Sequence, residues 1–212
     1  MSLVDVAPDE TALEAGGHAK GVAVAVVREN KDDSGLGRVK VSYPWHSKPS
    51  ESYWARIAVP MAGGKRGTWF LPENGDEVLV AFERGDLRFP YVVGALWNGV
   101  DKSPITNKDG KNDVRLIHTR KGHKLTFDDG SKGKVQLELN DGKRVTIDDD
   151  GLQINDGKGN SIVIQSNSGA ITIEAASNLT LKAPQIAIQA TGKLDVTASG
   201  NLTLSGALVR IN

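Results

Sequence analysis

Cysteine is absent from the 212 residues, which excludes disulfides and thiolate metal sites. There is also no net charge, because 26 acidic residues balance 26 basic ones. General electrostatic binding to nucleic acid or to an anionic membrane surface would need a basic excess or patch. No apolar run approaches the roughly 18 residues of a membrane-spanning helix. The first residues lack the basic and apolar regions of a secretory signal, so we expect assembly in the cytoplasm.

Aromatic residues are almost absent from the second half. Ten of the 11 lie between Tyr43 and Trp97, and none follows Phe127. The segment between these two parts is polar and rich in turn formers, which marks a domain boundary. We therefore expect a flexible N-terminal arm over residues 1–19, a first domain over 20–100, a linker over 101–113 and a second domain over 114–212.

The first domain is predicted to be a small β-barrel. Short alternating segments are separated by glycine turns, and five or six such strands between Lys20 and Trp97 favour a Greek-key barrel such as an OB-fold. Side chains fill the interior of a barrel of this size. We expect three residues on one face of each of two strands: Val39, Val41 and Tyr43, and Val78, Val80 and Phe82. We interpret three tryptophans as core or subunit contacts rather than ligand platforms: Trp54, Trp69 and Trp97.

The second domain is a repeat of apolar pairs whose two members are two residues apart. Successive pairs recur at short, similar intervals along the chain, and turn residues separate them. The pairs are Leu125/Phe127, Val135/Leu137, Val145/Ile147, Leu152/Ile154, Ile162/Ile164, Ile171/Ile173, Leu179/Leu181, Ile186/Ile188, Leu194/Val196, Leu202/Leu204 and Val209/Ile211.

This period, which settles near eight after Ile171, predicts an assembly of several chains. A strand with two inward residues buries too little apolar surface to offset the entropy of ordering eight residues. Eight residues reach about 25 Å when extended, which makes one side of a triangle and not its circuit. Three chains that each supply one side would enclose a common shaft. We expect the strands to run across the axis and to pair with the chains above and below; the alternative is a half-open monomeric sheet capped by the barrel.

The predicted shaft core consists of the inward pairs of the regular part of the repeat. These residues are Ile162, Ile164, Ile171, Ile173, Leu179, Leu181, Ile186, Ile188, Leu194, Val196, Leu202 and Leu204.

Catalytic and metal sites find little support in the sequence. There is no Gly-x-Ser-x-Gly elbow and no cysteine nucleophile, so we expect no enzyme activity and no cofactor. The acidic runs at Asp128–Asp129 and Asp148–Asp150 each precede a glycine, which is explained by turn chemistry. His118 and His123 have no carboxylate or cysteine at ligand spacing to complete a metal site. The Gly63–Gly67 loop lacks the Lys-Ser/Thr of a phosphate loop, although its Lys65 and Arg66 remain candidates for contact with a partner protein or neighbouring subunit.

Two other functions fit part of the pattern. An OB-fold protein that binds single-stranded nucleic acid would use aromatic residues beside a basic groove, but the net neutrality argues against it. A trimeric receptor-binding fibre would share the rod, but it would be expected to carry a distal globular head.

Several ordered motifs are similar to the VgrG and phage baseplate assembly protein V family, the central spikes of contractile injection systems. In the first domain they are Gly37–Val41, Trp54–Ile57, Pro72–Val80, Phe82–Asp86 and Pro90–Gly94, and the segment His118–Asp129 resembles the entry into that family's triple-stranded β-helix. The resemblance covers roughly residues 20–212.

The resemblance implies an all-β homotrimer with an N-terminal OB-fold collar and a C-terminal intertwined β-helix needle. Such a needle is a virion or injection-particle component that punctures a target membrane. Because the predicted barrel begins as early as Lys20, we expect a separate baseplate hub protein at the OB end. Because the last histidine is His123, the family's tip iron site is not expected. We instead expect a PAAR-like tip protein to contact Leu208, Val209 and Ile211.

Overall fold

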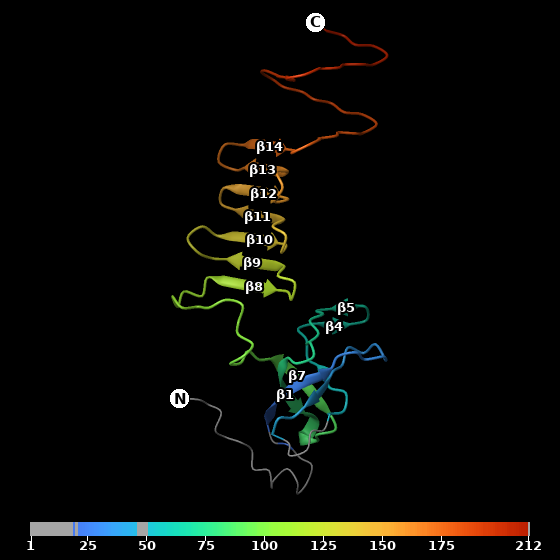
Figure 1. Cartoon of the computed structure of the whole chain (residues 1–212), viewed down its shortest axis with the longest axis vertical. Helices are drawn as coiled ribbons and strands as arrows, with labels where there is room; N and C mark the ends of the chain where they lie inside the picture. The colour runs from blue at the N-terminus through green and yellow to red at the C-terminus, as the bar shows by residue number, and fades with distance from the viewer. Residues whose placement is uncertain (1–18, 20, 46–50, 212) are drawn as a thin grey trace. The chain divides into compact units, whose positions relative to one another are not determined.

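The computed structural model describes residues 19, 21–45 and 51–211, and the chain divides into two compact units between Lys108 and Asp109 (Figure 1). The expected N-terminal arm lies outside the described residues apart from Ala19. Within these ranges there is no α-helix, and the sole helical element is the 3-10 turn η1 at Glu83–Gly85. The all-β fold is therefore confirmed. Nothing helical in these ranges is long or apolar enough to cross a bilayer.

The first unit is a closed sheet. Its five strands follow the order β2-β1-β6-β7-β3, and all neighbours are antiparallel except the parallel pair β3 and β7. A bridge between Val39 and Ala55, with N–O distances of 3.1 and 2.7 Å, joins the two ends of this order and closes the barrel. A separate hairpin is formed by β4 and β5. The strands are β1 (Val22–Glu29), β2 (Lys40–Ser42), β3 (Arg56–Ile57), β4 (Ala62–Gly63), β5 (Arg66–Gly67), β6 (Glu77–Phe82) and β7 (Pro90–Ala95).

Alternation along the strands builds the barrel core. Side chains two residues apart point to the same face of a strand, so each strand contributes every second residue to the interior. Both predicted trios are buried, which confirms the expected strand faces. A fully buried valine stabilises the fold by roughly 1.5–3 kcal/mol relative to an exposed one. The fully buried valines are Val27, Val39, Val41, Val78 and Val80.

The second unit begins as a seven-stranded antiparallel meander, in which each strand pairs with the next one in sequence (Figure 1). Sequence reasoning had instead paired these strands with other chains. A two-residue spacing fixes which side chains share a face, but it does not identify the partner strand. The strands are β8 (Val114–His118), β9 (Lys124–Asp128), β10 (Lys134–Glu138), β11 (Arg144–Asp148), β12 (Gly151–Asn155), β13 (Ser161–Gln165) and β14 (Ala170–Glu174).

The register places the apolar pairs in two columns on one face of this sheet, called here the apolar columns. Each antiparallel pairing sets the first member of one pair opposite the second member of the next, because the chain reverses at every turn. One column is Phe127, Val135, Ile147, Leu152, Ile164 and Ile171. The other is Ile117, Leu125, Leu137, Val145, Ile154, Ile162 and Ile173.

Past β14 the chain changes character. Residues 175–211 contain no assigned strand, although the apolar pairs continue. Figure 1 shows this segment crossing back and forth, with successive passes set farther apart than the strands of the meander. The segment therefore has no intrachain β-ladder to satisfy its backbone.

Candidate functional site

The apolar columns are largely uncovered in the single chain. All of their members except Leu125, Val145 and Leu152 are between 38% and 67% exposed. The fully buried valines of the barrel, in contrast, are 0% exposed. Contiguous exposed apolar surface of this kind is rare in monomeric proteins and marks interaction sites. The opposite face carries polar residues in its central column, including Thr126, Gln136, Thr146 and Gln153. One face of the meander is thus built to contact apolar surface that the chain itself does not supply.

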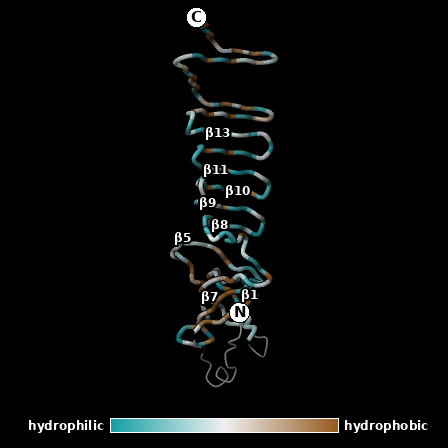
Figure 2. The backbone as a smooth tube through the Cα atoms, turned by 90° about the vertical axis from the view of Figure 1, so that its left-hand side faces the viewer, coloured by the Kyte–Doolittle hydropathy of each residue, from teal (hydrophilic) through white to brown (hydrophobic). Residues whose placement is uncertain are grey.

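The residues predicted as shaft core continue this surface. Ile162 and Ile164 lie in β13, Ile171 and Ile173 lie in β14, and the others lie within residues 175–211. All of them are exposed in the single chain, and Figure 2 shows apolar segments recurring along the upper passes. The columns begin before the predicted shaft core, with the predicted pair Leu125/Phe127 and with Ile117, which belonged to no predicted pair.

The three predicted tip contacts are also exposed. Leu208 is 71%, Val209 49% and Ile211 84% exposed. They extend the run of uncovered apolar residues to the end of the described chain. Their assignment to a tip protein stays a prediction.

The acidic runs of the second unit act in its turns. Asp148 Oδ1 accepts hydrogen bonds from the amides of Asp150 and Gly151 at 3.0 and 3.1 Å. Asp156 Oδ1 accepts hydrogen bonds from the amides of Lys158 and Asn160. A hydrogen bond from the Asn160 side chain, supported by these two amides, holds the pKa of Asp156 below its usual range. These contacts agree with the interpretation of the carboxylates as turn formers.

Glycine is required in the turn between β11 and β12. Gly151 has φ +140, and a Cβ there would lie 1.9 Å from the Ile164 carbonyl oxygen of the neighbouring strand. Only glycine allows this close approach, because any side chain would collide with the backbone of β13.

The histidines do not converge on a metal site. His123 Nδ1 accepts a hydrogen bond from the Asn140 amide at 3.3 Å, which ties together two turns on the same side of the sheet, 119–123 and 139–143. His118 ends β8 and pairs with Lys124 across the ladder. Among the residues that the structure describes, no group of three metal-binding side chains is found.

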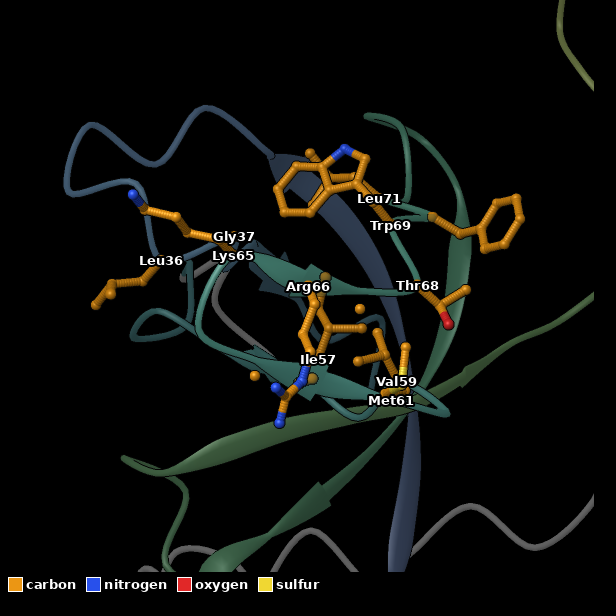
Figure 3. A pocket seen from close by; sticks show the side chains of 14 residues that line it. Leu36, Gly37, Ile57, Val59, Met61, Lys65, Arg66, Thr68, Trp69 and Leu71 are labelled. Carbon is orange, nitrogen blue, oxygen red and sulfur yellow. The ribbon is translucent and has the colours of Figure 1, made fainter.

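A pocket of about 480 Å³ lies in the barrel unit beside the β4–β5 hairpin (Figure 3). The Trp69 ring is 72% exposed and lies against Gly37, where an added Cβ would approach it to 2.7 Å. Met61 and Phe70 line the same pocket and are also exposed, and Arg66 and Lys65 flank it. The sequence did not predict this pocket. The exposure of Trp69 beside this pocket leaves its ring available for contact with a subunit or partner, so it is not a core residue.

Trp54 is placed differently from the other two tryptophans. It is half-buried, with the Arg38 guanidinium 5.4 Å and the Lys40 ammonium 5.0 Å from its ring centroid. Trp97 is exposed, like Trp69. Because two cations already occupy the neighbourhood of the Trp54 ring, this residue stabilises the barrel wall.

Arg38 also holds a loop carboxylate in place. Its Nε and Nη2 donate to the two oxygens of Asp32 at 2.8 and 3.0 Å, and Ser34 donates to the same carboxylate. The Asp32 side chain is only 4% exposed. The Arg38 hydrogen bonds, followed by those of Ser34, hold the pKa of Asp32 well below its usual range.

Comparison with known proteins identifies both units. Residues 23–97 match the family model described as the type VI secretion system/phage-baseplate injector OB domain. Residues 114–168 match the phage baseplate V C-terminal trimerisation domain. Together the two matches cover more than half of the chain.

Three relatives show the same similarity. The type VI secretion system spike protein VgrG3 of Vibrio cholerae is 33% identical over 112 residues, which are 49% of this chain. The actin cross-linking toxin VgrG1 of Vibrio cholerae is 33% identical over 128 residues, or 57% of this chain. The spike protein VgrG1a of Pseudomonas aeruginosa is 35% identical over 72 residues, or 32% of this chain. The matched region spans 11% of each relative's length.

The two family models match in the same order as the two units of the structure: the OB-domain model matches the barrel, and the trimerisation-domain model matches the sheet with the uncovered apolar columns. The resemblance seen in the barrel motifs is thereby confirmed. The chain belongs to the VgrG and phage baseplate assembly protein V family.

Proposed function

We propose that this chain forms a homotrimeric spike at the centre of a phage baseplate or a related contractile injection system. One observation carries the proposal: the two apolar columns lie uncovered on one face of a unit that matches a trimerisation domain. The names of the relatives, which include two type VI secretion system spike proteins, support it.

Three copies supply what the single chain lacks. Three meanders with their apolar columns turned inward would enclose a shaft, since each sheet covers the columns of the other two. Past β14, passes of the other two copies would lie between the separated passes of residues 175–211 and supply their backbone partners. The predicted shaft residues would then become the core of the needle.

The strand arrangement of the proposed needle suits it to a mechanical role. Strands that run across the long axis resist bending through many backbone hydrogen bonds at once. Such a needle transmits an axial push into a target membrane, with which it makes only transient contact. The proposal includes assembly in the cytoplasm before incorporation into the particle, and no catalysis by this chain.

Two partners complete the proposal. We place a baseplate hub protein on the barrel unit, supported by the exposed aromatic residues Trp69 and Phe70 beside the basic pair Lys65 and Arg66. We place a PAAR-like tip protein on the uncovered apolar residues Leu208, Val209 and Ile211. Alanine substitution of Trp69 and Phe70 should abolish co-purification of the hub without changing the oligomeric state.

The position in the particle tests the proposed role. An antibody against residues 51–100 should label the baseplate centre of intact phage tails or injection particles from cells that make this chain. Labelling of distal fibres would instead support a receptor-binding fibre. Salt-dependent retention of the purified chain on single-stranded DNA, with no labelling of particles, would support the nucleic-acid alternative.

A further inference from the structure

We propose that opposite charges on the two sides of the meander align the three copies, with the acidic turns of each chain against the basic turns of the next. The inference rests on the proposed trimer and names the contact that orients it. The acidic turns, named for the net charge of the set, are residues 129–133, 149–150 and 166–169, of which the last carries no charged residue. The basic turns are residues 119–123, 139–143 and 156–160.

Strand order separates the two sets. The chain reverses at every turn, so turns fall alternately on the two sides of the sheet (Figure 1). The turn between β11 and β12 therefore lies on one side, and those before β11 and after β12 lie on the other. All three basic turns project from one side of the sheet, and all three acidic turns project from the opposite side.

The charges of the two sets have opposite sign. The acidic turns hold three carboxylates and one cation: Asp129, Asp149, Asp150 and Lys132. The basic turns hold four cations and two carboxylates: Arg120, Lys121, Lys143, Lys158, Asp141 and Asp156.

Ion pairs within the chain do not cancel the difference in charge between the two sets of turns. Lys143 pairs with Asp141 of its own turn, and Asp129 pairs with Arg115 at 2.9 Å. Asp149 is exposed and has no ion pair among the described residues, and the same holds for Lys121 on the basic side. The charge left for a neighbour is therefore negative on one side and positive on the other.

This arrangement selects the direction of the copies. In a ring of parallel copies about the long axis, the acidic side of each sheet meets the basic side of the next at every junction. In an antiparallel face-to-face pair, acidic turns would meet acidic turns, and basic turns would meet basic turns. The apolar columns would be covered in either arrangement, so burial alone does not choose between them. Complementary charge favours the parallel ring and penalises the antiparallel pair.

Charge reversal tests the contact. The first variant, Asp149→Lys/Asp150→Lys, makes both sides basic; the second, Lys121→Glu/Lys158→Glu, makes both sides acidic. The third combines all four substitutions and restores opposite signs at every junction. An Asp33→Lys/Asp101→Lys variant places the same charge change on the barrel unit as a matched control. Light scattering after gel filtration gives the oligomeric state of each full-length variant.

We expect each two-site variant to associate about tenfold or more weakly than wild type at 0.1 M salt, where the Debye length is about 10 Å. Association should recover at 1 M salt, where that length is about 3 Å. The combined variant should form trimers like wild type at both salt concentrations, and so should the control. The recovery would show that folding of the turns was not the cause of the loss.

Three results would overturn the inference. The first is a pair of two-site variants that trimerise like wild type at low salt. The second is a combined variant that stays as weak as its parents. The third is a wild-type chain that remains monomeric, which would overturn the proposed trimer as well. In the first two cases the wild-type trimer stands, so failure of this contact is distinguishable from failure of the proposed function.

Discussion

An aspartate at Ile173 tests whether the apolar columns face a shaft. Ile173 lies in β14 opposite Ile162, and it is 52% exposed in the single chain. Full burial of an isoleucine is worth roughly 1.5–3 kcal/mol, so the half still exposed contributes about 0.8–1.5 kcal/mol per chain on assembly. A carboxylate enclosed in the shaft would add a desolvation cost of several kcal/mol per ion. For three chains the total reaches about 10 kcal/mol, and each 1.4 kcal/mol weakens association about tenfold.

The neighbouring residue provides the matched control. Thr172 lies on the opposite face, where it pairs with Val163, and it is exposed. Thr172→Asp keeps its charge in water, so stability should change by no more than about 0.5 kcal/mol. Light scattering at micromolar concentration should give a monomer for Ile173→Asp and a trimer for Thr172→Asp. The reasoning is refuted if Ile173→Asp stays trimeric and melts at the wild-type temperature.

Three further predictions concern the folded units. Gly151→Ala should destabilise the meander by more than about 1 kcal/mol in thermal unfolding, because its Cβ would collide with the Ile164 carbonyl; Gly99→Ala in the barrel unit, where an added Cβ meets no atom within 4 Å, should not. Burial raises the pKa of Tyr43 to about 12, so the barrel should lose stability as the pH rises from about 10 through 12; phenolate absorbance that titrates wholly near pH 10 before unfolding would contradict this. The pKa of Asp32 is lowered by Arg38, so its contribution is present above about pH 4 and is lost on acidification. Asp32→Asn should therefore unfold more easily than wild type at pH 7, with a difference that shrinks in acid; a difference independent of pH would contradict the ion pair.

Regular alternation made much of the fold predictable. The buried faces of two barrel strands followed from Val39 to Tyr43 and from Val78 to Phe82, because a strand has a fixed period of two. The same period identified the apolar pairs that now form the columns. The Asp-Gly turns followed from local side-chain hydrogen bonds, such as those that Asp148 accepts.

Features that depend on long-range contact were not predictable. The hydrophobic period could not show that β8 to β14 pair within the chain through residue 174. The pocket beside the β4–β5 hairpin arises because Trp69 lies against Gly37. These two residues are far apart in the sequence, and no periodic pattern around them predicts the contact. The opposite charge of the two sides of the meander appears only once the turns are assigned to alternate ends of the strands.

The mass of the particle in solution tests the central claim most directly. The chain has a mass of 22.6 kDa. Light scattering of the wild-type protein at micromolar concentration should give three times this mass, because three sheets are needed to enclose the apolar columns. A particle with the mass of one chain, stable and soluble at that concentration, would contradict the account.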